Sequence, residues 1–317
     1  MVGTGTPGSC TSATLAAAVR SGGSIGFDCG GAAVTIALDE TLYTCNTTAC
    51  GSGGSPVNAM TLDGGGKVTL SGGGARGIYY AASCADTDKL GWVSGRCNFA
   101  TNTYPRITFK NIAFANGNSP GYPAPFTGSG IDVPGGGGAI LMIGGTLTLQ
   151  NVDFRGNRCM ATSSDGGGGA VRVWGTPLPV TVSGSRFESN QCANGGAIST
   201  LQAPVTITGS TFTGNAATGH GNNAGLGGNG GAIYMDGRGE PLRISATTMT
   251  DNTSNGEGGA AIFYNANDDA HGDGTFSISG STLSRNTGQS FGQLPGIWYG
   301  DVSAGTVRFS ATSSSIS

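Results

Sequence analysis

Charged residues are scarce in this chain, and their scarcity excludes several classes of protein. Only 10% of the 317 residues are Asp, Glu, Lys or Arg, the formal net charge is −3, and Lys and Arg form no cluster. Nucleic-acid binding depends on cations that neutralise phosphates, so we expect no nucleic-acid partner. No apolar run reaches the roughly 18 to 20 residues that a membrane-spanning helix needs.

Linker-like segments and the features of a signal peptide are also missing from these 317 residues. No Pro-rich or charge-rich segment divides the chain, which predicts a single domain over residues 1–317. The first residues lack the charged and apolar regions of a signal peptide, and we expect Met1 to replace a leader that has been removed. Glycine is abundant instead, with 61 residues and no Gly-X-Y period, which predicts many tight turns.

Cysteine is present in an even number, without the paired CxxC spacing of a zinc site. The residues are Cys10, Cys29, Cys45, Cys50, Cys84, Cys97, Cys159 and Cys192. This pattern favours disulfides and an extracellular or cell-surface location, although free cysteines packed in a cytosolic protein are the alternative. Proximity along the chain pairs Cys10 with Cys29, Cys45 with Cys50, and Cys84 with Cys97.

Six segments of the chain share one ungapped frame. Each opens on an apolar residue and carries a second one two positions later, as in a strand with one buried face. The openings are Ile107, Leu147, Val180, Val205, Leu242 and Phe276; seven positions later stand Phe114, Phe154, Phe187, Phe212, Met249 and Leu283. Five copies continue three residues later with Asn157, Asn190, Asn215, Asn252 and Asn286, and GGA[IV] or GAAI motifs recur between copies.

A repeat of about 25 to 40 residues predicts a solenoid, in which parallel strands stack and like residues lie above one another. In this arrangement we expect the asparagines to adopt the left-handed conformation and to form an amide ladder, and the glycines to turn the opposite corner with positive φ. Cys159 and Cys192 each follow the Phe of consecutive copies by five residues, which predicts a disulfide between them. A β-sandwich would need antiparallel hairpins, which the spacing does not suggest.

The chain ends differ from the regular repeat. Residues 10–30 predict a short amphipathic helix, capped by Ser12 or Thr14, that covers the open end of the solenoid. We expect irregular rungs over 31–100, regular rungs over 101–290 and a last rung over 291–317, where VRFSATSSSIS forms a final strand.

GGA[IV] alternating with FxxN resembles the repeat of the chlamydial polymorphic outer-membrane proteins. The opening TLAAAV, GSIGFDC and TLDGGGKVTLSGGG is similar to that of many secreted proteins of the pectate-lyase-like superfamily. The resemblance covers roughly residues 10 to 290 and implies an all-β fold, a single-stranded right-handed parallel β-helix with a short N-terminal capping helix. It implies much less about activity.

Candidate site residues follow from strand alternation after each glycine corner. Ile233 and Met235 are expected to point inward, so the residues that alternate with them point outward. The equivalent outward positions predict a face that binds substrate or ligand. Its members are Arg172, Trp174, Tyr234, Asp236, Phe263 and Asn265. Aromatic covering of the strands is the alternative interpretation. The following loops add Arg238, Glu240, Asp268, Asp269, His271 and Asp273.

These residues suit two kinds of chemistry. In a lyase, the candidate acid, base and carboxylate-binding groups are Tyr234, Asp236, Arg238, Asp269 and His271. In a hydrolase, Asp236 and Asp269 would form the catalytic pair. Asp268 and Asp273 are candidate calcium ligands, with a solvated acidic turn as the alternative. Loops 118–136, with Tyr122 and Phe126, and 216–229, with the Gly-His-Gly around His220, are competing binding sites.

Three functions remain open. The first is a secreted or surface protein, expected to be monomeric, that binds polysaccharide or a glycan-bearing surface in the manner of an adhesin. The second is a polysaccharide lyase acting on a uronate polymer by β-elimination, and less favourably a glycoside hydrolase. The third is ice binding, which needs Thr-x-Thr repeated in register on a flat face; it ranks last because Thr206, Thr208, Thr211 and Thr213 fall in one rung.

Overall fold

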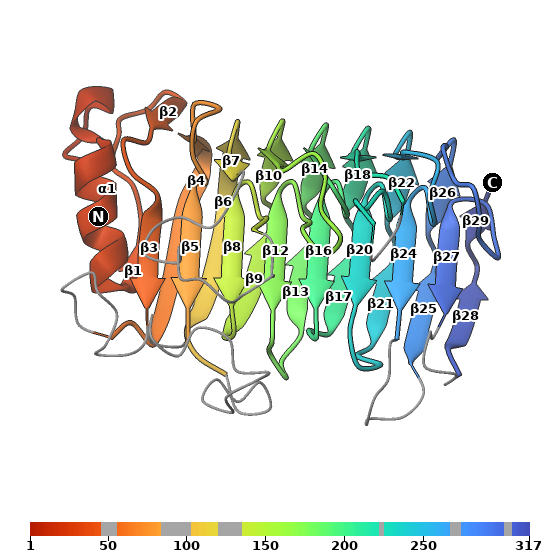
Figure 1. The fold of residues 1–317 in the computed structure, drawn as a ribbon. Coiled ribbons are helices and arrows are strands. Elements are labelled where there is room, and N and C mark those ends of the chain that lie inside the picture. Colours follow the sequence, from red (N-terminus) through yellow and green to blue (C-terminus); the bar gives the residue numbers. More distant parts are fainter. Residues whose placement is uncertain (46–55, 84–102, 120–134, 222–224, 267–273, 301–305) are drawn as a thin grey trace.

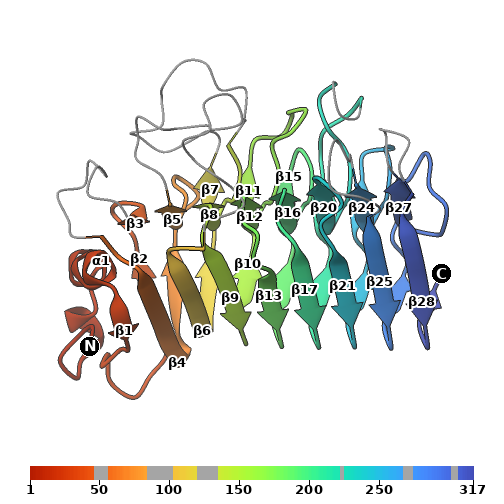
Figure 2. The same cartoon turned by 90° about the horizontal axis from the view of Figure 1, so that it is seen from below.

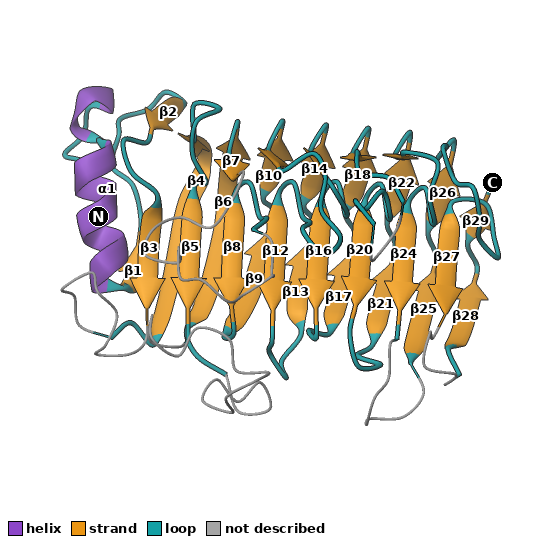
Figure 3. Cartoon of the chain, in the orientation of Figure 1, coloured by secondary structure: helices purple, strands orange, loops and turns teal. Residues whose placement is uncertain are grey.

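The computed structural model of the protein describes residues 1–45, 56–83, 103–119, 135–221, 225–266, 274–300 and 306–317. Within these residues it has one α-helix, α1 (Ser12–Ser21), a 3-10 turn at Pro7–Ser9, and many short strands arranged in stacks (Figures 1 and 3). Every pairing that the structure describes between two named strands is parallel. The all-β fold with parallel strands is therefore confirmed, and the hairpins of a sandwich are excluded for these strands.

The strands form four stacks, which the chain visits in turn. The first stack begins with β1 (Gly23–Ile25) on the first half of the long strand β4 (Ala59–Ser71). It continues through the first half of β6 (Arg106–Ala115), β9 (Thr146–Gln150), β13 (Val180–Ser183), β17 (Val205–Thr208), β21 (Leu242–Ser245), β25 (Thr275–Ser279) and β28 (Arg308–Thr312). The second stack begins with β2 (Val34–Ala37) on the second half of β4 and passes through the second half of β6. It continues through β10 (Asp153–Arg155), β14 (Arg186–Glu188), β18 (Thr211–Thr213), β22 (Thr248–Thr250), β26 (Thr282–Ser284) and β29 (Ser315–Ile316).

The third and fourth stacks complete each winding. The third contains β7 (Asn118–Ser119), β11 (Arg158–Cys159), β15 (Gln191–Cys192), β19 (Ala216–Ala217) and β23 (Thr253–Ser254). The fourth contains β3 (Leu42–Cys45), β5 (Tyr79–Ala82), β8 (Ile140–Ile143), β12 (Val171–Trp174), β16 (Ile198–Leu201), β20 (Ile233–Asp236), β24 (Ile262–Asn265) and β27 (Ile297–Gly300). Figure 2 shows the first stack as a row of side-by-side strands. The order β13, β14, β15, β16, β17 returns the chain to the first stack, as in a solenoid.

The core consists of columns of like side chains, one from each winding. Phe114, Phe154, Phe187 and Phe212 stack face to face, with ring centroids 5.1, 4.8 and 4.5 Å apart, and none is exposed. Met249 and Leu283 continue this column in register. The predicted inward position seven residues after each opening is thus confirmed.

The predicted asparagine ladder is confirmed, but the prediction that the asparagines adopt the left-handed conformation is wrong. The side-chain amides of Asn157, Asn190 and Asn215 each donate to the oxygen of the next asparagine at 2.9 to 3.0 Å. Positive φ occurs instead at the residue before each asparagine, which is Gly156, Ser189, Gly214, Asp251 or Arg285. The bend at that residue directs the following amide into the protein, where it bonds to the neighbouring windings.

A second ladder, which the sequence did not suggest, lies at the corner between the first two stacks. The hydroxyl oxygens of Ser185 and Ser210 accept from the backbone N–H one winding below, at 3.1 Å, and each hydroxyl donates to the carbonyl two residues earlier. Thr247, Ser281 and Ser314 repeat this arrangement. The glycine corners behave as predicted, with positive φ at the first Gly of each motif, for example Gly168 and Gly230.

Helix α1 stands at the N-terminal end of the stacks, beside β3 (Figure 1). Leu15 and Val19 are buried against the first windings, as expected of a helix that covers an open end. The cap residue is Thr11 rather than Ser12 or Thr14. The Thr11 hydroxyl accepts from the Thr14 backbone N–H, and the Thr14 hydroxyl accepts from the Thr11 backbone N–H.

Two predicted disulfides are confirmed. Cys159 and Cys192 lie in adjacent windings with Cα atoms 4.8 Å apart, and Cys10 is bonded to Cys29 with Cα atoms 5.6 Å apart. The pairings of Cys45 with Cys50 and of Cys84 with Cys97 involve side chains outside the described residues. At the C-terminus, β28 and β29 extend the repeat by one winding, with Phe309 over Phe276 and Ile316 over Leu283.

Candidate functional site

The outward residues of the fourth stack occupy the positions that alternation predicts. Ile233 and Met235 of β20 belong to the core, and Tyr234 and Asp236 between them point away from it. In register along the stack, Arg172, Ser199, Tyr234, Phe263 and Trp298 form one outward column. Trp174, Leu201, Asp236 and Asn265 form the second.

These outward side chains are buried, contrary to the expected solvent-facing ligand surface. Arg172 and Tyr234 are each 1% exposed and Asp236 is 3% exposed, and Trp174, Phe263 and Asn265 are buried too. The glycine-rich corner segments cover the column that contains Arg172, Tyr234 and Phe263. A Cβ at Gly136 would lie 2.8 Å from Cδ of Arg172, and one at Gly195 would lie 3.0 Å from Cβ of Tyr234. Glycine therefore lets the backbone rest directly on this face.

Tyr234, Asp236 and Asn265 form a buried polar cluster. The Tyr234 hydroxyl donates to one carboxylate oxygen of Asp236, and the Asn265 amide donates to the other, both at 3.0 Å. Burial raises the pKa of Asp236 to about 6 despite these two hydrogen bonds. Burial and the charges of Asp236 and Asp165 raise the pKa of Tyr234 well above its ordinary value, so this tyrosine stays protonated.

Arg172 brings a buried positive charge to the same face. One of its terminal nitrogens donates to the Ser199 hydroxyl at 3.0 Å. Its Nε finds no hydrogen-bond partner among the residues that the structure describes. The guanidinium opposes the effect of the carboxylates on the pKa of Tyr234, so it lies within electrostatic reach of the cluster.

An aromatic stack extends from the cluster toward the C-terminal windings. Phe263 stacks on Tyr234 with centroids 5.3 Å apart and on Trp298 at 4.2 Å, and Phe291 meets Trp298 edge-on. Phe291 is 38% exposed. Trp298 and Phe291 are not among the predicted site residues, although IWYG at 297–300 repeats the spacing of IFYN at 262–265.

The remaining predicted site residues divide into two groups. Arg238 and Glu240 lie in the turn after β20, where the Glu240 carboxylate accepts from the Arg238 backbone N–H at 2.6 Å and so stabilises the turn. Asp268, Asp269, His271 and Asp273 lie outside the described residues, as do Tyr122 and Phe126. Their predicted catalytic and calcium-binding roles stay predictions. Within the described ranges, no group of three or more His, Cys, Asp or Glu side chains is arranged to hold a metal ion.

Asn194 and Asn229 form a further, unpredicted ladder immediately before two of the glycine corners. Both amides are buried, and Asn229 donates to the side-chain oxygen of Asn194 from its backbone and its amide. Asn194 in turn donates to the carbonyls of Ser163, Ser164 and Gly166. The signal was available as NGG in two of the repeated motifs.

The first stack presents a column of five threonines on its outer face. Thr61, Thr108, Thr148, Thr181 and Thr206 are register partners from β4 to β17, and all are partly exposed. We call this set the threonine column. The next outward column contains Asp63, Lys110, Gln150, Ser183 and Thr208. These side chains form a long polar surface made of equivalent positions one strand apart.

Thr-x-Thr is not confined to one rung, which corrects the expectation from the sequence. In the second stack, Thr211 and Thr213 of β18 pair in register with Thr248 and Thr250 of β22. These pair in turn with Thr282 and Ser284 of β26. We call these six residues the hydroxyl grid.

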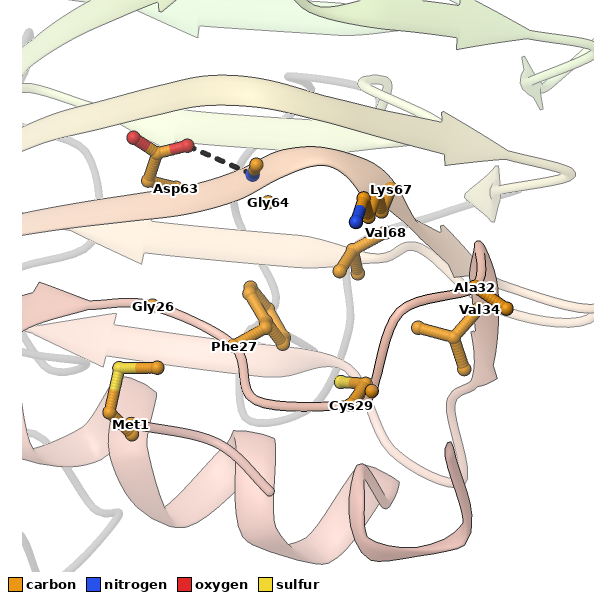
Figure 4. A pocket seen from close by; sticks show the side chains of 12 residues that line it. Met1, Gly26, Phe27, Cys29, Ala32, Val34, Asp63, Gly64, Lys67 and Val68 are labelled. Carbon is orange, nitrogen blue, oxygen red and sulfur yellow. Dashed lines mark hydrogen bonds between the residues drawn. The ribbon is translucent and has the colours of Figure 1, made fainter. Parts of the chain in front are cut away.

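A pocket of about 430 Å³ lies at the N-terminal end, and Asp63 of the outward column beside the threonine column is part of its lining. Side chains from the segment after β1, such as Phe27 and Cys29, face those from the middle of β4, such as Lys67 and Val68 (Figure 4). Asp63 accepts from the Gly65 backbone and from the Asn111 amide, both at 3.0 Å, so its carboxylate stabilises the local turn.

None of the helices that the structure describes is long and apolar enough to cross a membrane. Comparison of the chain with protein-family models, curated proteins and solved structures finds no match.

Proposed function

We propose that the chain is an extracellular right-handed parallel β-helix of the pectate-lyase-like type that binds polysaccharide or a glycan-bearing surface without cleaving it. The parallel stacks support the fold assignment, and the disulfides Cys10–Cys29 and Cys159–Cys192 support an oxidising location. We expect the protein to act as a monomer.

The threonine column carries this proposal. A polysaccharide offers hydroxyl and ether oxygens at regular intervals, and the column offers partly exposed hydroxyls at each of five successive strands. Single hydrogen bonds of this kind contribute only about 1 kcal/mol each. Several that engage one polymer at once raise the affinity through effective concentration. Lys110 and Gln150 beside the column add donors for acidic or neutral sugars.

One observation favours the lyase as a second candidate. Asp236, with its pKa raised to about 6, has the proton affinity of a general base working near neutral pH. Asp236 is only 3% exposed, so the protein would have to rearrange before a polymer could reach its carboxylate. The outer polar faces need no such rearrangement, and they therefore favour binding without catalysis.

The test combines binding and turnover on the full chain. Wild-type protein, Thr181→Lys in the middle of the threonine column, and the control Thr35→Lys on β2 are applied to insoluble polysaccharides and a glycan array. Thr181→Lys should weaken binding roughly fivefold or more, as expected from the loss of about 1 kcal/mol, and Thr35→Lys should leave it unchanged. No binding by wild type, or equal loss in both variants, would overturn the proposal.

Turnover is measured as absorbance of unsaturated uronates on pectate, alginate and glycosaminoglycans, with and without calcium. The proposal expects no new absorbance. Absorbance that appears with wild type and disappears in Asp236→Asn would establish the lyase instead.

A further inference from the structure

The hydroxyl grid is a second outer surface, separate from the threonine column. Its members are Thr211, Thr213, Thr248, Thr250, Thr282 and Ser284, two from each of three adjacent strands. One member of each pair is exposed and the other partly exposed. Ser315 of β29 extends the exposed column by one more strand. No charged side chain stands at these outward positions.

The grid hydroxyls are not used by the protein. Within the described part of the chain, no side-chain hydrogen bond involves any of the six. The neighbouring buried hydroxyls of Ser210, Thr247 and Ser281 all donate to backbone carbonyls, at 2.8 to 3.0 Å. The two sets therefore have different roles: the buried hydroxyls hold the windings together, and the grid hydroxyls face solvent.

Charge is segregated from the grid along the same stack. The preceding strands carry Asp153 and Arg155 on β10 and Arg186 and Glu188 on β14. In each strand the two charges form an ion pair with each other. The outward positions of the strands thus change from paired charges to hydroxyls at β18. The nearest charges to the grid are Asp251 and Arg285, one residue past β22 and β26, and they form an ion pair with each other.

Buried ladders on both sides fix the spacing of the grid. The ladder of Ser210, Thr247 and Ser281 lies one residue before each grid strand. The ladder of Asn215, Asn252 and Asn286 lies two residues after it. Neighbouring strands in a sheet are about 4.8 Å apart, and alternate residues along a strand are about 6.6 Å apart. The hydroxyls therefore form a rigid array that repeats in two dimensions.

We propose that the hydroxyl grid binds ice. A rigid array that repeats in two directions is matched best by a ligand that is itself rigid and periodic in two directions, because no conformational freedom is then lost on contact. The grid positions carry no charge, and the adjacent Asp251 and Arg285 neutralise each other, which argues against an ionic polymer. Each threonine supplies a hydroxyl that bonds to water and a methyl group that limits other hydration, so the grid can hold surface water in a fixed lattice. Flatness is consistent with the unbroken register from β18 to β26.

The proposal is tested on the full chain by the gap between melting and freezing temperatures and by ice-crystal shape. Wild type should shape ice crystals and open a measurable gap. Thr248→Lys, at the centre of the grid, should reduce the gap at least fivefold. The control Thr35→Lys on β2 and Thr181→Lys in the threonine column should each keep it within twofold of wild type.

Several results would overturn the inference. These are unshaped ice with wild type, a Thr248→Lys variant that behaves like wild type, or an equal loss in Thr181→Lys. Circular dichroism and thermal unfolding check that each variant is folded, and Thr282→Lys repeats the test if Thr248→Lys melts early. The assay contains no glycan, so failure here is separate from failure of the polysaccharide proposal.

Discussion

The side-chain amide of Asn215 donates to the side-chain oxygen of Asn252 at 2.9 Å, and neither residue is exposed. The same amide donates to the Phe187 carbonyl at 3.0 Å, and the Asn215 oxygen accepts from both the backbone and the amide of Asn190 at 3.0 Å. One side chain therefore connects three successive windings, and every polar group it touches is satisfied by it.

Asn215→Ala should strongly destabilise the protein. The change leaves the buried Asn190 backbone N–H and the Phe187 carbonyl without their side-chain partner, and it removes one hydrogen bond each from the Asn190 amide and the Asn252 oxygen. Each buried group left unpaired costs about 1 to 3 kcal/mol. We expect a loss of at least about 3 kcal/mol in the free energy of unfolding, measured by denaturant titration. Asn286→Ala is the matched control, because Asn286 ends the ladder and is partly exposed; it should cost less than half as much. Equal losses would show that the ladder does not act as proposed.

Gly230→Ala and Gly209→Ala separate the two roles of glycine in this fold. Both glycines have positive φ, 65° and 57°. A Cβ at Gly230 would overlap the Ile233 carbonyl oxygen, whereas a Cβ at Gly209 meets no atom within 4 Å. Gly209→Ala should cost about 1 to 2 kcal/mol for the left-handed backbone alone, and Gly230→Ala about 1 to 3 kcal/mol more for the overlap.

Thermal and denaturant unfolding of both variants measure this difference. A Gly230→Ala protein as stable as Gly209→Ala would mean that the corner can relax away from Ile233. The glycines of the GGA[IV] motifs would then be required for φ alone.

Strand alternation and copy-to-copy alignment were sufficient to predict the stacks, the phenylalanine column and the Cys159–Cys192 bond. Each depends only on equivalent positions lying above one another, which any in-register solenoid enforces. The identity of the left-handed residue was not predictable in this way. Ser189 and Asp251 take positive φ although both are less suited to it than asparagine, because Asn190 and Asn252 are needed inside the ladder.

Burial of Tyr234 and Asp236 was also not predictable from alternation. A period of two distinguishes the two sides of a strand, but it does not say whether the outer side meets solvent or another segment. The cover over Tyr234 comes from the corner at Gly195, whose close approach depends on tertiary packing. The hydroxyl grid, in contrast, was predictable from the alignment of the repeats. Thr248 and Thr282 stand at the position of Thr211, so a comparison of the outward positions between copies would have identified it.

The buried carboxyl of Asp236 should make stability depend on pH in the direction opposite to that of most carboxylates. Its pKa is raised from 3.8 to about 6 in the folded protein, so the folded state binds its proton more tightly than the unfolded chain does. By linkage, the stabilisation is present at pH values below the unfolded pKa and is lost as pH rises from about 4 to about 6. A shift of about two units corresponds to roughly 3 kcal/mol.

Asp236→Asn isolates this contribution, because an amide does not titrate and other carboxylates cancel in the comparison. The unfolding free energy of wild type minus that of Asp236→Asn should fall by roughly 2 to 3 kcal/mol between pH 4 and pH 7. Asp251 provides the opposite case, because the hydrogen bond from exposed Arg285 lowers its pKa. The unfolding free energy of wild type should therefore rise relative to that of Asp251→Asn as pH increases through the acid range. Urea titrations at the two pH values measure both differences. A difference for Asp236→Asn that stays constant, or that rises with pH, would show that the carboxylate is better solvated than its burial beside Tyr234 and Asn265 implies.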